Sequence, residues 1–462
     1  MSGFQLGQFD DRNTAAAAAG VSDIAASVQA AAHASAAGGE EPYDAVLNSV
    51  RRQMAEGGRW PPHRLDNPTP QDQKEAEDLI RRCANSYQET AQVNSLPALD
   101  DEERVVQAIL DEIFGWGPIS AYMQDPNVEE ILVNGPKNIW VIDGEKGKYQ
   151  VGVQFRSGAQ LVNFINRAAA PKGRKIDRKS PELNVKMRDG SRMHAIMEPL
   201  TDNLPIAVTI RRHRLVARTL DDLVALGTVS APVARFFRWA VAGRLNVIIS
   251  GGTGTGKTNM INALCSEIPP HERVITVEDT QELQLHTIQD WVALVTREAS
   301  EGTKAITQQD LIRNTLRMRP DRVITGEARG SEVVDILKAA NTGHDGQMLT
   351  VHANSERDVI DRLEGLYLEG LPNANETNIR RQVATAFQLV IQLERVEIAG
   401  KIQRLVTGIA ELTGRMEGRV PEIVPLFEDR GSGLTWSGVF PKCIETINKR
   451  GGLAVNFREI AN

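Results

Sequence analysis

The sequence has few cysteines, no long apolar run and no excess of positive charge. Its 462 residues include three cysteines, Cys83, Cys265 and Cys443, and no CxxC pair. A structural zinc site is therefore not expected, and so sparse a set of thiols is typical of a reducing compartment. No stretch approaches the ~20 apolar residues of a membrane span. The N-terminus also lacks the basic start and apolar core of a signal peptide. We expect a cytoplasmic protein, with peripheral membrane attachment left open.

The charge balance is weakly acidic. The formal net charge is −7 at pH 7, with 41% hydrophobic and 24% charged residues. A protein that coats nucleic acid usually needs a basic field, so no nucleic-acid partner is expected, although basic clusters occur locally. The ordinary composition indicates that most of the chain folds, and its length favours two globular domains with tails.

Four consecutive segments differ in composition and pattern. Residues 1–40 are rich in Ala, Ser and Gly, and we expect a disordered tail there. Residues 41–99 look helical and polar, with interruptions at glycine and proline. Residues 100–215 should form a smaller N-terminal α+β domain, and residues 216–462 a larger α/β domain.

The segment 100–215 mixes helix and strand signals. An apolar stripe at helical spacing predicts a core-facing helix that is capped by Asp100 or Asp101 and ends near Gly115. A second helix is expected over residues 158–169. Short β-branched runs predict strands at residues 130–133, 139–142, 194–197 and 206–210.

From residue 216 onward, strand and helix signals alternate, which implies a largely parallel sheet. Open α/β sheets place ligands at the carboxyl ends of their strands. A capped helix is expected over residues 230–242. The predicted strands are residues 246–250, 273–277, 321–325, 347–352, 387–394 and 404–409.

The most informative segment, residues 247–258, reads Val-Ile-Ile-Ser-Gly-Gly-Thr-Gly-Thr-Gly-Lys-Thr. An apolar strand runs into this glycine-rich loop, and a helix should follow over residues 259–266. The backbone N–H groups of such a loop surround α- and β-phosphates, Lys257 can reach the β- and γ-phosphates, and the Thr258 hydroxyl can hold Mg²⁺. This context favours a phosphate loop over a glycine-rich turn without a ligand. The predicted nucleotide contacts are Gly251, Gly252, Thr253, Gly254, Thr255, Gly256, Lys257, Thr258 and Asn259.

Three carboxylates, Glu278, Asp279 and Glu282, follow the strand expected at residues 273–277. Mg²⁺ prefers oxygen ligands and keeps several waters, so carboxylates beside a phosphate loop can hold the ion or its waters. Alone, such a segment is more often a solvated turn, but the loop upstream favours a function. We predict Thr258 and Glu278 as metal ligands and Glu282 as a catalytic residue.

Another carboxylate, Glu327, ends the strand expected at residues 321–325. In a phosphate-loop sheet this position lies next to the γ-phosphate, where Glu327 can polarise the attacking water and support the Mg²⁺ shell. The alternative is a glutamate that caps the helix starting at Ser331. We predict a catalytic and metal-supporting role for Glu327.

Two histidines, His344 and His352, bracket a predicted strand. Their spacing of eight residues predicts, by strand alternation, that both lie on the same face. Further ligands for a metal site are missing from the pattern. We expect hydrogen-bonding sensors of the phosphate or of a neighbouring subunit. A histidine satisfied within the fold is the ordinary alternative.

Four arginines, Arg192, Arg211, Arg212 and Arg214, precede the phosphate-loop segment. Arginine suits bidentate phosphate contact, and one supplied by another domain or subunit can neutralise transition-state charge. A basic surface patch and a nucleic-acid strip are the alternatives, and the lack of neighbouring aromatics disfavours stacking on single strands. Arg192, Arg211 and Arg212 are the predicted catalytic residues.

Together these segments resemble the secretion ATPase superfamily. In the same order, its Walker A, Asp box, Walker B and His box look like residues 251–258, 277–282, 317–329 and 342–355. The upstream segments resemble the CpaF/TadA branch, which powers Tad (Flp) pilus assembly, at residues 125–131, 133–136, 189–192 and 209–212. The resemblance covers about residues 100–445. Residues 1–60 match nothing assignable, and the four-cysteine zinc insert of many type II secretion members is missing.

The resemblance implies a hexameric ring. Each subunit would carry an N-terminal domain of mixed sheet and a C-terminal RecA-like domain, with ATP bound at the domain junction. Arg192, Arg211 and Arg212 are similar to the arginines that reach phosphate there. Members work at the cytoplasmic face of the inner membrane on a platform protein, and hydrolysis is thought to move pilin subunits into or out of the filament. Peripheral membrane association follows from the same resemblance.

The leading hypothesis is an ATP-driven motor for pilus assembly or secretion, in which water attacks the γ-phosphate of Mg·ATP. Lys257 and Arg212 would stabilise charge, and Glu327 would orient or activate the water. One alternative is a RecA-like nucleic-acid translocase or a conjugative or type IV secretion ATPase. The acidic net charge argues against the nucleic-acid translocase. Another is a nucleotide-sensing scaffold with vestigial hydrolysis, against which the intact Lys257, Thr258, Glu278 and Glu327 argue.

Overall fold

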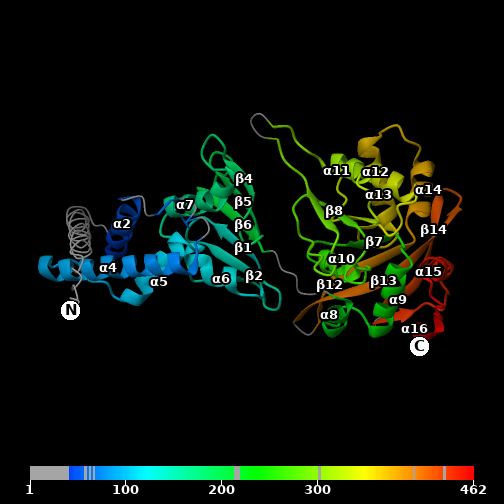
Figure 1. Cartoon of the computed structure of the whole chain (residues 1–462), viewed down its shortest axis with the longest axis horizontal. Coiled ribbons are helices and arrows are strands. Elements are labelled where there is room, and N and C mark those ends of the chain that lie inside the picture. Colours follow the sequence, from blue (N-terminus) through cyan, green and yellow to red (C-terminus); the bar gives the residue numbers. More distant parts are fainter. Residues whose placement is uncertain are drawn as a thin grey trace, which may run out of the picture. The chain divides into compact units, whose positions relative to one another are not determined.

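The computed structural model describes residues 41–56, 60–61, 64–65, 68–212, 219–299, 303–398, 401–429 and 433–461 (Figure 1). Two compact units divide the chain, Met1–His213 and Arg214–Asn462. The disordered tail predicted for residues 1–40 lies outside the described residues, as does Arg214. The domain bounds expected from the sequence stay predictions.

Three helices of the first unit enclose a small apolar core. They are α2 (Pro42–Ala55), α4 (Pro70–Asn94) and α5 (Glu102–Ile113). A capping box starts α4, because the Thr69 hydroxyl accepts the Asp72 backbone N–H at 3.1 Å and the Asp72 carboxylate accepts the Thr69 backbone N–H at 2.8 Å. Asp101 caps α5, which confirms the predicted start of that helix. The shared core includes Val46, Ile80, Tyr87 and Ile109.

A six-stranded antiparallel sheet forms the rest of the first unit, in the order β3-β2-β1-β6-β5-β4. One of its faces packs on α7 (Gly158–Ala169), whose Phe164 and Ile165 share a core with Ile131 and Ile210. The short helices are η2 (Gly117–Ile119), α6 (Ser120–Gln124) and η3 (Ala170–Lys172). The strands are β1 (Val128–Asn134), β2 (Ile139–Asp143), β3 (Gly147–Gln150), β4 (Glu182–Lys186), β5 (Arg192–Met197) and β6 (Ile206–Arg211).

The second unit contains a nine-stranded sheet in the order β15-β14-β13-β12-β7-β11-β10-β8-β9. Six neighbouring strands are parallel: β7 (Val247–Gly251), β8 (Val274–Glu278), β9 (Trp291–Val295), β10 (Arg322–Thr325), β11 (Met348–Val351) and β12 (Leu389–Ile398). Antiparallel pairing extends this sheet by β13 (Lys401–Glu417), β14 (Val420–Asp429) and β15 (Leu434–Trp436).

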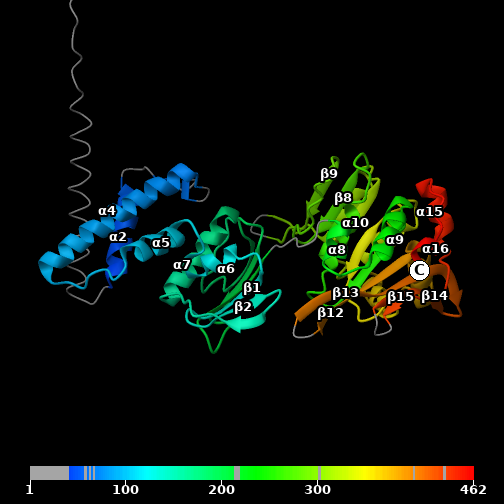
Figure 2. The same cartoon turned by 90° about the horizontal axis from the view of Figure 1, so that it is seen from below.

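Helices cover both faces of this sheet, and each face has its own apolar core (Figure 1). On one face lie α8 (Leu220–Ala225), α9 (Ala231–Ala242), α10 (Lys257–Cys265) and α15 (Cys443–Gly451), with α16 (Arg458–Ala461) next to α9 (Figure 2). On the other face lie α11 (Gln308–Thr315), α12 (Val333–Ala340), α13 (Asp358–Gly370) and α14 (Glu376–Ala386). Every residue of β7, β8, β10 and β11 is buried, as expected for strands covered on both sides.

The predicted strands of the second unit are confirmed in position. They correspond to β7, β8, β10, β11 and β12, and the segment 404–409 lies inside β13. The expectation of a largely parallel sheet holds for six strands, whereas β13, β14 and β15 pair antiparallel, and β13 runs far longer than the predicted segment 404–409. The prediction missed β9, β14 and β15 in this unit, and β3 and β4 in the first unit.

The strand order brings the predicted functional segments to one edge. β11 lies between β7, which feeds the glycine-rich loop, and β10, which ends just before Gly326. Because all three strands are parallel, their carboxyl ends share this edge. The structure is thus a RecA-like P-loop α/β fold preceded by an α+β unit, as the sequence predicted.

A buried ion pair stabilises the opposite edge of the sheet. The fully buried Arg322 side chain donates from Nε to Glu272 Oε2 at 2.6 Å and from Nη2 to the Val241 carbonyl at 2.9 Å. Arg244 also contacts Glu272, at 3.1 Å. Although burial opposes the charge of Glu272, Arg322 and Arg244 hold its pKa below the ordinary value.

Glu272→Ala should destabilise the protein strongly, because it leaves the Arg322 charge buried without its partner. We expect a loss of about 3–5 kcal/mol. Chemical denaturation followed by circular dichroism measures it. The control is Asp221→Ala, which removes the exposed partner of Arg238 and should cost about 1 kcal/mol or less. Equal losses in the two variants would show that the buried ion pair stabilises the protein no more than an exposed one.

Candidate functional site

The glycine-rich loop joins β7 to α10 through backbone conformations that favour glycine. Gly251, Gly254 and Gly256 have φ values of +149°, +73° and +95°. A side chain at Gly251 would also meet the Leu393 carbonyl oxygen at 2.4 Å, because β7 pairs there with β12. The loop is therefore tightly seated at the carboxyl end of its strand, and α10 begins at Lys257. These are the features of a phosphate loop.

The Lys257 side chain lies inside the loop. It is buried, and its ammonium donates to the carbonyl oxygens of Gly251 at 2.9 Å and Gly252 at 2.8 Å. The same nitrogen lies 3.5 Å from His352 Nδ1. The amine is thus aimed at the concave side of the loop, where a phosphate would replace the carbonyl oxygens.

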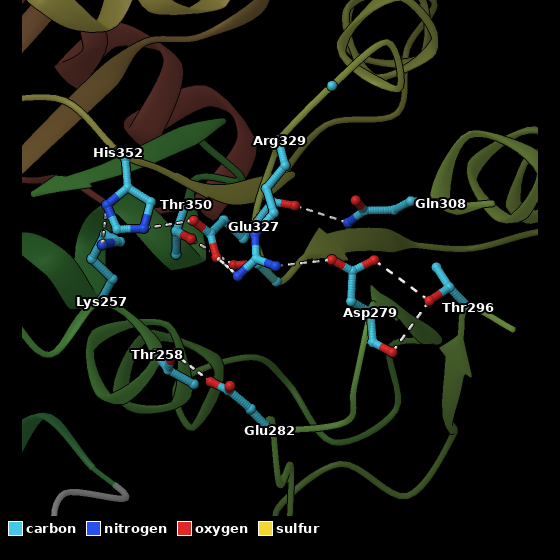
Figure 3. A network of polar contacts seen from close by, with 12 residues as sticks. Lys257, Thr258, Asp279, Glu282, Thr296, Gln308, Glu327, Arg329, Thr350 and His352 are labelled. Carbon is cyan, nitrogen blue, oxygen red and sulfur yellow. Dashed lines mark hydrogen bonds and ion pairs between the residues drawn. The ribbon is translucent and has the colours of Figure 1, made fainter. Parts of the chain in front are cut away.

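An acidic segment approaches the start of α10 (Figure 3). The Thr258 hydroxyl donates to Glu282 Oε2 at 3.0 Å. Glu278 is buried, and its Oε1 accepts the backbone N–H groups of Glu282 at 2.9 Å and Leu283 at 3.1 Å. Glu278 therefore fixes the backbone that presents Glu282 to Thr258. The carboxylate that contacts the predicted metal ligand Thr258 is Glu282 and not Glu278.

The oxygen atoms of Thr258 and Glu282 fit Mg²⁺, which prefers oxygen ligands and needs few of them from the protein because it keeps several waters. Groups of three or more His, Cys, Asp or Glu that could hold a metal ion do not occur among the described residues. The metal roles of Thr258, Glu278 and Glu327 stay predictions.

Glu327 is the centre of a polar network (Figure 3). Its Oε2 accepts a hydrogen bond from Arg329 Nη2 at 2.5 Å, and its Oε1 lies 2.7 Å from His352 Nε2. Arg329 also donates to Asp279 Oδ2 at 3.2 Å. Gln308 Nε2 donates a hydrogen bond to the Glu327 backbone carbonyl at 2.9 Å. The carboxylate is thereby oriented from both sides, at the same edge as the phosphate loop.

His352 connects Lys257 to Glu327. Burial and the nearby Lys257 lower the pKa of His352 below its ordinary value, with Glu327 acting in the opposite direction. A neutral imidazole at pH 7 has one acceptor and one donor nitrogen. Because an ammonium can only donate, Nδ1 is the acceptor nitrogen of the neutral ring, at 3.5 Å from Lys257, and the hydrogen is on Nε2, which lies 2.7 Å from Glu327 Oε1. His352 thus links the loop to the carboxylate through a single ring.

His344 does not join this group, and the prediction that both histidines lie on one face of a strand is wrong. β11 spans only Met348–Val351, so His344 precedes the strand and His352 follows it. Strand alternation does not extend through the turn before β11. The residues next to His344 make contacts at the opposite edge, where Asp345 pairs with Arg450 at 2.9 Å and Gly346 packs against Arg322.

The predicted arginines belong to the first unit. Arg192 of β5 and Arg211 of β6 lie directly opposite each other, and Glu130 of β1 lies opposite Arg211. Their neighbours Met193 and Ile210 are buried on the α7 side, so alternation places the two arginines on the other face of the sheet. Their predicted contact with phosphate stays a prediction.

Arg212 is held differently. Its Nη1 donates to the backbone carbonyl of Tyr122 at 3.2 Å and to that of Asp125, both at the end of α6. The structure therefore groups Arg192 with Arg211, while Arg212 fixes the chain where α6 turns into β1.

Sequence reasoning missed two arginines at the site. Arg329 follows Glu327 by two residues, so its proximity could have been inferred from the segment Gly326-Glu327-Ala328-Arg329. Arg404, whose Nε donates to the Gly254 carbonyl at 2.9 Å, is 150 residues from the loop and carries no local signal. Only the long β12–β13 pairing brings it there.

Acidification should weaken the native state through His352. Because its folded pKa is lowered, the unfolded chain binds more protons between the folded and unfolded pKa values. The contribution of His352 to the free energy of unfolding is therefore complete above the ordinary histidine pKa of about 6.5. It is lost as the pH falls through the pKa of His352 in the folded protein. His352→Gln should therefore lose less thermal stability than the wild type between about pH 7.5 and pH 5. The exposed His286→Gln is the control, and equal losses in all three proteins would contradict the assignment.

Comparisons with known proteins agree with the resemblance to secretion ATPases. A putative conjugal transfer protein of Mycobacterium tuberculosis is 34% identical over 336 residues, which are 71% of this chain and 92% of that protein. The type IV secretion system protein PtlH of Bordetella pertussis is 30% identical over 337 residues, 67% of this chain and 96% of that protein.

The solved structure of the VirB11 ATPase from the Brucella suis type IV secretion system, in complex with sulphate, is 25% identical, covers 68% of this chain and 98% of its own, and has a TM-score of 0.36. The model of the family described as type II/IV secretion system protein matches residues 113–408. The match spans more than half of the sequence, so the chain belongs to the type II/IV secretion system protein family.

Proposed function

We propose that the chain hydrolyses Mg·ATP and uses the energy to drive assembly of a Tad or type IV pilus, or protein secretion. One observation carries the hydrolysis: Lys257 of the phosphate loop and Glu327 of the neighbouring strand end both contact His352, at 3.5 Å and 2.7 Å. A phosphate-binding cation and a candidate base therefore face the same point of the sheet edge.

Substrate binding would replace contacts that the loop makes to itself. The phosphate oxygens would take the place of the Gly251 and Gly252 carbonyls around the Lys257 ammonium. The loop N–H groups and the N-terminal end of α10 would face the same anion. Thr258 and Glu282 would hold Mg²⁺, which neutralises charge on the phosphate oxygens when it is bound.

Glu327 is placed to orient and activate the attacking water. Its carboxylate is ion-paired with Arg329 and contacts His352, so its position is fixed before a water is bound. Orientation of the nucleophile is the main task of the protein in phosphoryl transfer, because the transition state is largely dissociative. Arg192, Arg211 and Arg212 remain candidates for charge stabilisation by a second domain or subunit.

Glu327→Gln should bind ATP as the wild type does and lose most hydrolysis, about 10²–10⁴-fold in kcat, because the amide cannot accept a proton from water. Lys257→Ala should lose binding as well as turnover. Phosphate release and the binding of a fluorescent ATP analogue measure the two effects. Glu376→Gln, an exposed change at the start of α14, is the matched control. Unaltered turnover in Glu327→Gln would remove this residue from its role.

The proposed partners follow from the family rather than from a contact in this structure. We infer a hexamer that works on an inner-membrane platform protein and, through it, on pilin. Peripheral association with the inner membrane is part of the same proposal. The described helices include none with the length and apolarity needed to cross a bilayer. The mass of the protein with a non-hydrolysable ATP analogue tests the hexamer.

A conjugative or type IV secretion ATPase is the second candidate, and the names of the relatives favour it. Deletion of the gene in the host separates the two. For a pilus motor, surface filaments should disappear and should return with the wild-type gene but not with Glu327→Gln. Intact filaments together with lost DNA or protein transfer would favour the second candidate instead.

A further inference from the structure

The hairpin formed by β12 and β13 projects past the phosphate loop (Figure 1). β12 pairs with β7 only as far as Leu393, which lies opposite Gly251, the residue where β7 ends. Beyond that point β12 continues to Ile398 and pairs with β13 alone. The outer part of the hairpin therefore extends beyond the end of β7, on the side of the loop.

Two arginines of this outer part lie directly opposite each other. Arg395 of β12 pairs in register with Arg404 of β13, so both side chains leave the same face of the hairpin. Both also reach the loop. Arg404 Nε donates to the Gly254 carbonyl at 2.9 Å, and Arg395 Nη1 lies 3.9 Å from the position of a Cβ at Gly254.

The Arg404 bond determines how one loop peptide is turned. In a planar trans peptide the carbonyl and the following N–H point in opposite directions. The Gly254 carbonyl points toward Arg404, so the N–H of Thr255 points away from the hairpin. The Cδ atom of Arg404 also lies 3.4 Å from the position of a Cβ at Gly256, which is van der Waals distance. One arginine side chain thus lies against two loop residues.

Arg395 offers a second, exposed guanidinium at the same place. Across the described residues, no carboxylate lies within ion-pair distance of it. Like charges directly opposite each other on paired strands repel, and an anion between or beside them relieves the repulsion. Arginine is well suited to this because its planar fork matches the geometry of phosphate oxygens.

We propose that the hairpin is a second phosphate-recognition element. Arg404 is a positioning residue that holds the peptide between Gly254 and Thr255 with its N–H inward, and Arg395 contacts the phosphate chain of a nucleoside di- or triphosphate. This inference rests on the nucleotide binding proposed above and adds two residues to that site.

The test compares Arg395→Ala and Arg404→Ala with Arg419→Ala, which changes an exposed arginine in the turn between β13 and β14. Each of the first two variants should raise the Kd for fluorescent ADP and the KM for ATP about tenfold, the effect of losing a hydrogen bond to a charged group. The kcat should fall less than the KM rises, because the two arginines contact the loop at Gly254, whereas the Glu327 carboxylate contacts Arg329 and His352. Arg419→Ala should bind as the wild type does.

Lysine variants distinguish positioning from direct contact. Arg404→Lys keeps a donor for the Gly254 carbonyl and should restore most of the affinity, whereas Arg395→Lys keeps the charge but not the fork and should restore less. Thermal midpoints are measured for every variant. If Arg404→Ala does not fold, Arg404→Lys and the exposed Arg395→Ala decide the question.

Two failures can be told apart. If the wild-type protein does not bind ADP or ATP, or if Lys257→Ala binds as tightly as wild type, the proposed function fails. If Lys257→Ala loses binding while Arg395→Ala and Arg404→Ala bind as tightly as Arg419→Ala, the function stands and the role of the hairpin is overturned.

Discussion

The parallel pairing of β7, β11 and β10 is the constraint on which the site depends. Val351 of β11 lies opposite Ser250, and Thr325 of β10 lies opposite Leu349. This register places three chain segments side by side at one edge, each just after its strand: the phosphate loop, His352 and Glu327. A slip by one residue would turn each buried strand over and carry these side chains away from one another. The full burial of all three strands makes such a slip costly, because every side chain would leave the core in which it is packed and enter the other.

Several polar groups at this edge already have partners within the protein. The Lys257 ammonium donates to loop carbonyls, and the Thr258 hydroxyl donates to Glu282. The Glu327 carboxylate contacts Arg329 and His352. A substrate phosphate must therefore exchange with protein contacts and not simply add to them, so its net affinity is smaller than its contact list suggests. The neutral state of His352 matters here. A protonated ring would donate from both nitrogens and could no longer accept from Lys257.

Local patterns predicted the parts of the fold and site that local sequence determines. The β7–loop–α10 segment and the positions of β8, β10 and β11 could be found because apolar runs and turn residues are contiguous. The position of His344 outside the strand could not be found, because strand alternation was extended into a turn that only the structure shows. The backbone contacts of the buried Glu278 also escaped the sequence, and its metal role stays a prediction. The contact of Arg404 with Gly254 joins segments that are 150 residues apart, and no short sequence pattern predicts it.

The antiparallel extension of the sheet gives the phosphate loop a second support. A two-stranded ribbon that extends beyond its sheet is only marginally stable by itself. The bond from Arg404 to the Gly254 carbonyl therefore stabilises hairpin and loop together. If this bond fixes a phosphate-binding N–H, phosphate affinity and hairpin orientation are linked, and linkage is reciprocal. Anything that displaces the hairpin would then weaken nucleotide binding, and nucleotide binding would resist that displacement by the same free energy. Such a connection would join nucleotide binding at the sheet edge to movement of a surface element, as the proposed motor function requires.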